Sequence, residues 1–304
     1  MKKSFVITDD FVNTRLDRWF RKNISVVPQS LIEKNIRKGK IKVNSKKQKS
    51  SYRLQNSDKV EIFDINFSSN QHKKVSKKYI ATKKDLSKSS SIFIENNENF
   101  VVINKPPGIS VQSGTKSRRN VLDILRYTKE FEGASPYPVH RIDKETTGVL
   151  IVAKNRKFAQ LFTSLFRLRK IHKTYLAIVL GDFKNDKGTL IDELFYYEGD
   201  KRSKVKAITH YRVLDTNNNY SLLKLNPETG RKHQLRKQLL IHGNPVLGDS
   251  KYRISKNYPS KNNLLMLHAY KIKFSIANTK YDFSADPSLE FKNTLKEKYL
   301  KIFQ

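Results

Sequence analysis

The sequence contains no cysteine among its 304 residues, which excludes disulfides and metal sites built from thiolates. Long apolar runs are also missing, and none approaches the ~18 residues that a helix needs to cross a bilayer. The first ten residues, MKKSFVITDD, lack the apolar stretch of a signal peptide. We therefore expect neither a disulfide-bonded secreted scaffold nor an integral membrane protein.

Acidic residues are scarce, with 28 Asp+Glu against 61 Lys+Arg, which gives a formal charge of +33 and a pI near 10.1. Such a charge favours a polyanionic partner, nucleic acid first and an anionic membrane surface second. Lysine outnumbers arginine 44 to 17, however, and an AT-rich genome would produce that bias without selection for binding. Only 37% of residues are hydrophobic, but local apolar runs are dense enough for packed cores.

The pattern along the chain predicts two domains joined by a linker. Residues 1–63 read as a small unit of two helices and short alternating strands, and residues 64–91 are a polar stretch rich in Lys and Ser. From residue 92 many alternating runs are mixed with a few helices. This pattern predicts an α+β domain over 92–304 with a large, mostly antiparallel sheet.

Several elements of the larger domain are specific enough to place. The apolar runs on either side of residues 95–99 predict a hairpin, and residues 149–153 (VLIVA) predict a buried strand. Residues 155–170 repeat apolar side chains at i, i+3, i+4 and i+7, which predicts an amphipathic helix. Further strands are expected at 174–180, 205–214, 220–226 and 264–274.

The first unit carries a cluster of cations on and after its second predicted helix, formed by Lys34, Arg37, Lys38 and Lys40. The simplest interpretation is a solvated surface that keeps a small domain soluble. The segments RLDRWFRK, SLIEKNIRKGKIKVN and YRLQNSDKVEI within 13–63 nevertheless resemble an S4 RNA-binding domain. This resemblance implies that the four cations contact the phosphates of a structured RNA.

The densest polar segment, Pro138–Gly148, directly precedes the predicted buried strand. Taken alone it is a turn in which Asp143 caps the backbone, the commonest role of an Asp in a loop. However, PVHRIDKETTGVLIVAKN resembles the signature HRLDxxTSG of the RluA-type pseudouridine synthases. Other motifs of that family follow its order, namely NKPPG (104–108), KTYLA (173–177), GRKHQLR (230–236), GNPVLGD (243–249) and LHA (267–269).

The resemblance implies a reaction that converts uridine in RNA to pseudouridine, with Asp143 as the essential carboxylate. Arg236 would hold that carboxylate negative, since a guanidinium stays charged and pairs with a carboxylate through two N–H groups. Tyr175 would stack on the flipped base. Arg141 would lie beside the flipped nucleotide and fill the vacated space or hold a phosphate.

Each of these residues also has an ordinary structural interpretation. Arg236 could be a solvated residue on a helix whose buried stripe contains Leu235 and Leu239, and Tyr175 could be a core residue. The sequence departs from the family at Lys232 and at Lys237-Gln238, where the family usually has Thr and Val-His. These departures put the helix packing and the RNA contacts near that motif in doubt.

The resemblance further implies a monomer in the cytoplasm that needs no cofactor and no metal, and the histidine spacings match no zinc motif. The S4-like start and NKPPGISVQSGT (104–115) are most similar to members that modify large-subunit ribosomal RNA. A rival interpretation remains, a non-catalytic S4-type RNA-binding factor of ribosome assembly. Charge and the S4-like pattern fit it equally well, whereas the loop at 138–148 favours the enzyme.

Overall fold

The computed structural model describes residues 2–25, 27–63, 79–82, 85–87, 91–113, 119–183, 185–198, 201–217, 219–254 and 264–302. The chain forms two compact units, residues 1–77 and 78–304. Each unit has its own hydrophobic core. We describe each unit by itself.

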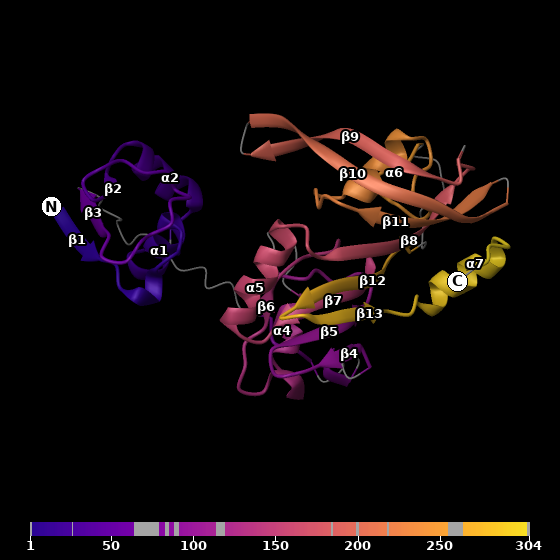
Figure 1. Cartoon of the computed structure of the whole chain (residues 1–304), viewed down its shortest axis with the longest axis horizontal. Coiled ribbons are helices and arrows are strands. Elements are labelled where there is room, and N and C mark those ends of the chain that lie inside the picture. Colours follow the sequence, from indigo (N-terminus) through magenta and orange to yellow (C-terminus); the bar gives the residue numbers. More distant parts are fainter. Residues whose placement is uncertain are drawn as a thin grey trace. The chain divides into compact units, whose positions relative to one another are not determined.

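The first unit packs two helices on a small antiparallel sheet in the order β1-β3-β2 (Figure 1). Trp19 and Phe20 of α1 and Ile32 and Ile36 of α2 meet Val60 in its core. A short 3-10 helix, η1, precedes α1. The elements are β1 (Lys2–Val6), η1 (Asp9–Phe11), α1 (Leu16–Asn23), α2 (Gln29–Arg37), β2 (Ile41–Val43) and β3 (Lys59–Phe63).

The second unit is built on one sheet whose strand order is β4-β5-β7-β12-β8-β11-β10-β9, with β13 paired to β12 and β6 to β7. Among the described strand pairs, β7 and β12 run parallel and the others antiparallel. The expected α+β class with a mostly antiparallel sheet is confirmed. The strands are β4 (Phe93–Asn96), β5 (Phe100–Lys105), β6 (Tyr137–Pro138), β7 (Thr147–Ala153), β8 (His172–Leu180), β9 (Lys187–Glu198), β10 (Lys201–Thr216), β11 (Tyr220–Pro227), β12 (Leu267–Ile276) and β13 (Thr279–Ser284).

Helices cover both faces of this sheet, which explains why every residue of β7 is buried. Leu150 and Val152 point to one face and pack in the core that contains α4 (Val121–Leu125) and the 3-10 helix η2 (Lys129–Phe131). Ile151 points to the other face, where Phe162 of α5 (Arg156–Arg167) lies. The predicted buried strand and amphipathic helix are thus confirmed.

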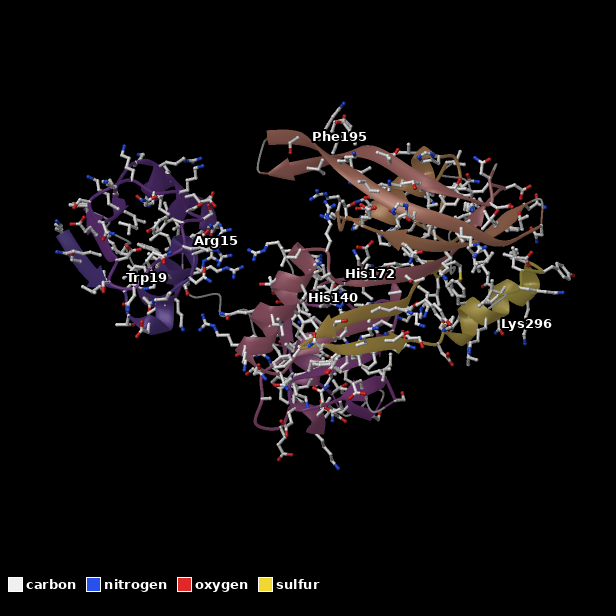
Figure 2. The ribbon with its side chains drawn as sticks, viewed as in Figure 1. Arg15, Trp19, His140, His172, Phe195 and Lys296 are labelled. Atoms are coloured by element: carbon white, nitrogen blue, oxygen red, sulfur yellow. The ribbon has the colours of Figure 1, made fainter. Side chains whose placement is uncertain are left out.

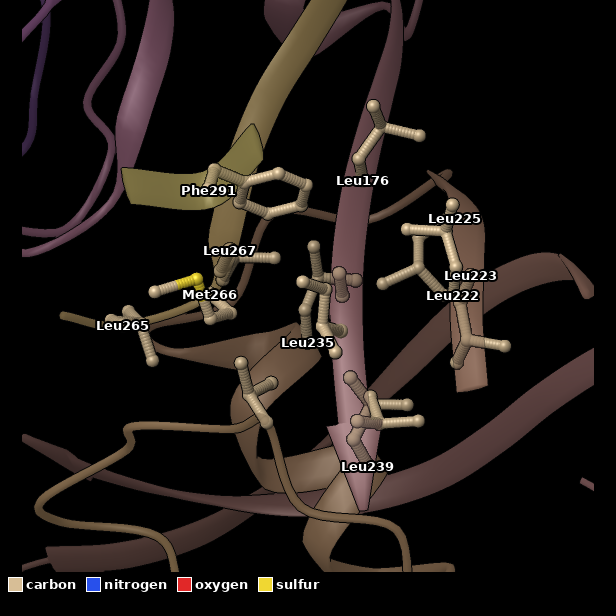
Figure 3. Close-up of a cluster of buried hydrophobic side chains, with 14 of the residues drawn as sticks. Leu176, Leu222, Leu223, Leu225, Leu235, Leu239, Leu265, Met266, Leu267 and Phe291 are labelled. Carbon is tan, nitrogen blue, oxygen red and sulfur yellow. The ribbon is translucent and has the colours of Figure 1, made fainter. Parts of the chain in front are cut away.

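The other half of the sheet is stabilised by α6 (Gln234–Ile241) and α7 (Leu289–Glu297). Leu235 and Leu239 of α6 and Phe291 of α7 belong to one cluster with the leucines of β8 and β11 (Figure 3). Because α6 carries the last three residues of the GRKHQLR motif, Gln234, Leu235 and Arg236, this packing fixes where they lie. The sequence pattern did not predict β9, β13 or α7.

The predicted linker at 64–91 falls largely outside the described residues. Its described later part belongs to the second unit, which begins at residue 78. Tyr79 packs against the core under α4, and Asp85 accepts hydrogen bonds from Tyr79 Oη at 2.5 Å and Arg119 Nε at 3.0 Å. These contacts join the segment after residue 78 to the larger fold.

Candidate active site

The loop between β6 and β7 presents Asp143, and its shape is set by local hydrogen bonds. The backbone carbonyl of Asp143 accepts a bond from Thr146 N at 3.2 Å, which closes a turn. Two apolar residues of the loop, Val139 and Ile142, are buried and anchor it. The Asp143 side chain keeps 22% of its surface exposed. The carboxylate is therefore held at the surface of the fold and is accessible.

The Thr-Thr-Gly end of the loop allows β7 to approach β12 closely. Gly148 has φ 106°, and a Cβ there would lie 2.2 Å from the backbone oxygen of Ala269. Next to this contact between Gly148 and Ala269, Thr147 Oγ1 is hydrogen-bonded to Nδ1 of buried His268 at 2.8 Å. Ala269 is in turn paired with Tyr175 of β8. The close approach at Gly148 thus leaves only β12 between the Asp143 loop, which leads into β7, and Tyr175 on β8.

Buried Lys105 ties the NKPPG turn to the Asp143 loop. Its Nζ donates to the carbonyls of Pro106 at 2.8 Å, Ile109 at 3.1 Å and Lys144 at 3.0 Å. Three acceptors match the three N–H groups of an ammonium. Burial lowers the pKa of Lys105 to about 7, and the charges of Glu145 and Asp143 act against this shift. The lysine of this motif therefore positions the residue that follows Asp143.

His140 fastens the start of the loop to β7 and α5. Its Nε2 accepts a hydrogen bond from Ile151 N at 2.9 Å. Its ring stacks on that of Phe166, with 4.7 Å between the ring centres. Figure 2 labels His140 beside α5. Burial lowers its pKa to about 3, and the charge of Lys173 adds to that effect. The imidazole is therefore neutral at pH 7 and accepts the backbone bond.

Arg236 reaches Asp143 from α6, whose N-cap residue, His233, has a left-handed conformation with φ 54°. Gln234, the first residue of the helix, holds the preceding segment in place, because its Oε1 accepts from Arg231 N at 3.0 Å and from Thr229 Oγ1 at 2.7 Å. This helix start places Arg236 in the first turn of the helix, where it reaches the Asp143 loop.

The departure from the family at Gln238 has a structural explanation. Gln238 is fully buried and accepts from Thr209 Oγ1 at 2.7 Å, while its Nε2 donates to Asp192 Oδ2 at 2.8 Å. It therefore fastens α6 to β9 and β10. Lys237, beside it, reaches the carbonyl of Phe195 on β9 at 3.4 Å.

Arg236 bridges two carboxylates. Its Nη1 lies 3.2 Å from Asp143 Oδ2, while its Nε and Nη2 contact the two oxygens of Asp249 at 2.6 and 2.7 Å. Its side chain is 7% exposed and that of Asp249 is 0% exposed. The interpretation of Arg236 as a solvated residue is therefore wrong. Burial alone would lower the pKa of Arg236, but Asp249 and Asp143 raise it above its ordinary value, so the guanidinium stays charged.

A cavity of about 780 Å³ opens in front of this pair. Asp143, Tyr175, Arg236 and Arg141 all line it, so the structure brings the four predicted residues together. Arg141 is exposed and Tyr175 is half-buried. Burial raises the pKa of Tyr175 and the Asp143 charge adds to it, so the phenol keeps its proton.

Other residues of the site carry no assigned role from sequence. His233 Nε2 lies 3.7 Å from Asp143 Oδ1, and its Nδ1 is bonded to Tyr252 Oη at 2.8 Å. The guanidinium of Arg236 lies 5.0 Å from the centre of the Tyr252 ring. Asp249 is the last residue of the GNPVLGD motif, so the sequence singled it out as a motif residue but did not indicate its contact with Arg236. For Tyr252, which lies outside the motifs, no pattern gave a signal.

The cations predicted to bind RNA lie in the first unit. Lys34 and Arg37 are exposed on α2, Lys38 follows as its C-cap, and Lys40 is half-buried. Cations at a helix C-terminus also stabilise the helix dipole, so their position has a structural reason as well.

The described residues contain no cluster of three or more His, Asp or Glu side chains able to hold a metal ion. No described helix is both long and apolar enough to span a membrane.

Comparisons with known proteins agree with this geometry. The family model described as RNA pseudouridylate synthase matches residues 99–240. The ribosomal large subunit pseudouridine synthase C of Buchnera aphidicola subsp. Baizongia pistaciae is 32% identical over 305 residues, covering 95% of each chain. The protein of that name from Rickettsia bellii is 33% identical over 296 residues, covering 92% of this chain and 95% of its own.

The chain belongs to the RNA pseudouridylate synthase family. It is an RNA pseudouridine synthase, so the rival interpretation as a non-catalytic RNA-binding factor is wrong. The expected similarity to family members that modify large-subunit ribosomal RNA is confirmed, because both of these relatives are named as synthases of that subunit. Among solved structures, human RNA pseudouridylate synthase domain containing 4 matches with a TM-score of 0.61 and 26% identity, covering 71% of this chain and 95% of that one.

Proposed function

We propose that this enzyme isomerises specific uridines of large-subunit ribosomal RNA, with Asp143 as the catalytic carboxylate. The observation that supports this most is the Asp143–Arg236 contact of 3.2 Å at the wall of a cavity that also contains Tyr175. The curated relatives named above as large-subunit enzymes support the choice of RNA. The excess of basic residues fits a polyanionic substrate.

The reaction needs one carboxylate and no added reactant. The bond between C1′ and N1 breaks, a bond between C1′ and C5 forms, and the proton on C5 is lost while N1 regains one. Arg236 holds Oδ2 of Asp143, and Oδ1, which lies 3.7 Å from His233 Nε2, is left to meet the sugar or the base of the substrate. A carboxylate in this position serves either as nucleophile at C1′ or as base at the sugar.

Tyr175 and Arg141 take complementary parts in this proposal. The Tyr175 ring stacks on the uracil after it leaves the helix, because a flat apolar face replaces the lost neighbours. Its hydroxyl stays protonated, since burial and the Asp143 charge raise its pKa. Arg141 is exposed at the cavity, where a cation contacts the phosphates that flank the flipped nucleotide.

The first unit is proposed as an S4 RNA-binding domain that anchors the substrate through Lys34, Arg37, Lys38 and Lys40. Replacing these four cations with Gln should weaken binding to ribosomal RNA and flatten its salt dependence, by up to about 0.9 in slope for each lost phosphate contact. An unchanged slope would count against the anchor. The enzyme is further expected to act as a cytoplasmic monomer without a cofactor.

The decisive experiment for the catalytic role is Asp143→Asn, an isosteric change that removes the charge. We expect no pseudouridine in large-subunit ribosomal RNA and an RNA affinity within a few-fold of wild type, because phosphate contacts dominate affinity. Modification and binding are measured on the same preparation. Retained modification would exclude Asp143 as the catalytic residue.

A further inference from the structure

A second concave surface lies on the sheet of the catalytic unit and shares no lining residue with the active-site cavity. It is a groove of about 590 Å³ crossed by β8, β10, β11 and β12. We call it the rear groove and define it by Thr174, Leu176, Arg212, Lys224, Lys271 and Lys273. No acidic residue lines the groove in the described part of the chain.

Strand alternation places the rear groove on the opposite side of the sheet from the active site. Successive side chains of a strand point to opposite faces. On β8, Lys173 and Tyr175 line the active-site cavity, whereas Thr174 and Leu176 line the rear groove. Ile302, which follows α7, contributes to its wall (Figure 1 shows α7 beside this part of the sheet). The two surfaces are therefore distinct.

Two cations of the rear groove, Arg212 and Lys224, form a row with a third cation outside it, Lys187, and this arrangement is unfavourable for the fold. Lys187 on β9, Arg212 on β10 and Lys224 on β11 are direct neighbours in the strand register. Like charges placed directly opposite each other destabilise a sheet. No ion pair or hydrogen bond of these three side chains occurs among the described residues, and all three are exposed. A row of three unpaired cations is thus maintained across three strands.

The rest of the groove keeps the same excess of positive charge. Lys271 and Lys273 on β12 share one carboxylate, Asp282, with both distances 3.1 Å. Thr174 lies beside Lys271 in the register of β8 and β12. The concave wall thus combines unneutralised cations with a hydroxyl, which suits an extended chain of phosphates.

We propose that the rear groove binds the phosphate backbone of the same RNA substrate, at a segment distant from the modified uridine. This inference rests on the proposed function for the identity of the RNA. A large folded RNA offers backbone on both sides of the enzyme, and each cation that meets a phosphate releases counterions. Such contact adds affinity for large RNA without touching the target uridine.

The test is Arg212→Glu in the full-length enzyme, with in vitro transcribed large-subunit ribosomal RNA as the probe. A glutamate between Lys187 and Lys224 turns two repulsive neighbours into attractive ones. We therefore expect an unchanged or raised melting temperature together with weaker RNA binding. The salt slope should fall by about 0.9 for each lost phosphate contact, which is about 3.5-fold in affinity per fourfold change in salt. Lys224→Glu should behave in the same way.

Two controls separate this proposal from its alternatives. Lys129→Glu makes the same charge change at an exposed residue of η2 that lines neither the active-site cavity nor the rear groove, and should leave the salt slope unchanged. A short stem–loop cut around a modified uridine should be converted by Arg212→Glu at the wild-type rate. If Arg212→Glu binds the large RNA as wild type does, or loses no more affinity than Lys129→Glu, the rear groove is not an RNA surface. Failure of the proposed function is a different result, because wild type would then form no pseudouridine in either RNA.

Discussion

Arg236 has two separable duties, because it neutralises buried Asp249 and also holds Asp143. Arg236→Met leaves Asp249, with 0% of its side chain exposed, without its bidentate partner. Breaking a buried ion pair from one side costs about 3–5 kcal/mol of folding free energy. The same change removes the 3.2 Å contact to Asp143, so activity should fall as well.

A second substitution separates the two effects. In Arg236→Met/Asp249→Asn no charge is left at the fully buried position 249, and the Asn oxygen can still accept the backbone bonds of Lys251 N and Tyr252 N, which are 2.8 and 2.9 Å in length. We expect the double variant to recover at least about 1.5 kcal/mol of stability relative to Arg236→Met, since removing both partners is far less costly than removing one. Its activity should stay low, because Asp143 remains without its guanidinium.

The assay follows release of tritium from C5 of labelled uridine in RNA, alongside urea denaturation of each variant. Arg236→Lys provides a further comparison, since it keeps the charge but loses the planar fork. If the double variant regained activity together with stability, Arg236 would be only a structural residue. Its contact with Asp143 would then not be needed for catalysis.

Two further predictions concern the loop that carries Asp143. His140→Phe leaves Ile151 N–H without its acceptor, so we expect a loss of about 1–3 kcal/mol by denaturation at pH 7. The pKa of His140 is about 3 in the folded protein and 6.5 in the unfolded chain. The neutral ring therefore contributes fully to the free energy of unfolding above pH 6.5, and this contribution falls by up to about 1.4 kcal/mol per pH unit toward pH 3. His140→Phe should lose that slope, and an unaltered slope would contradict the assignment. Gly148→Ala drives a Cβ to 2.2 Å from Ala269 O, so destabilisation of about 2 kcal/mol or more and loss of activity are expected. If Gly148→Ala kept the melting temperature and turnover of wild type, the close approach of β7 and β12 would not be needed for folding or activity.

The larger elements of the fold followed from sequence periodicity, and the site followed from a resemblance. The run VLIVA predicted a strand buried on both faces because no polar residue interrupts it, and β7 is such a strand. By contrast, β9 was missed because polar and charged side chains break its apolar pattern (for example Asp192, which accepts a bond from Gln238).

The contacts of the site could not be derived from local pattern. Arg236 and Asp143 are 93 residues apart, and the contact depends on the helix start at His233 and on the pairing of β7 with β12. A helical arginine among leucines is ordinarily solvated, so only the motif pointed to the site. Lys105 and Asp249 were noted as members of motifs, whereas their roles as anchors emerged only from the hydrogen bonds that they make.

The most direct measurement is pseudouridine mapping of large-subunit ribosomal RNA from cells that lack this protein, complemented either with wild type or with Asp143→Asn. We expect defined uridines to be unmodified in the deletion strain, to be modified again with the wild-type chain and to remain unmodified with Asp143→Asn. If the Asp143→Asn chain restored them, the central role of that carboxylate would be contradicted. If the deletion changed no uridine of this RNA, the proposed substrate would be wrong.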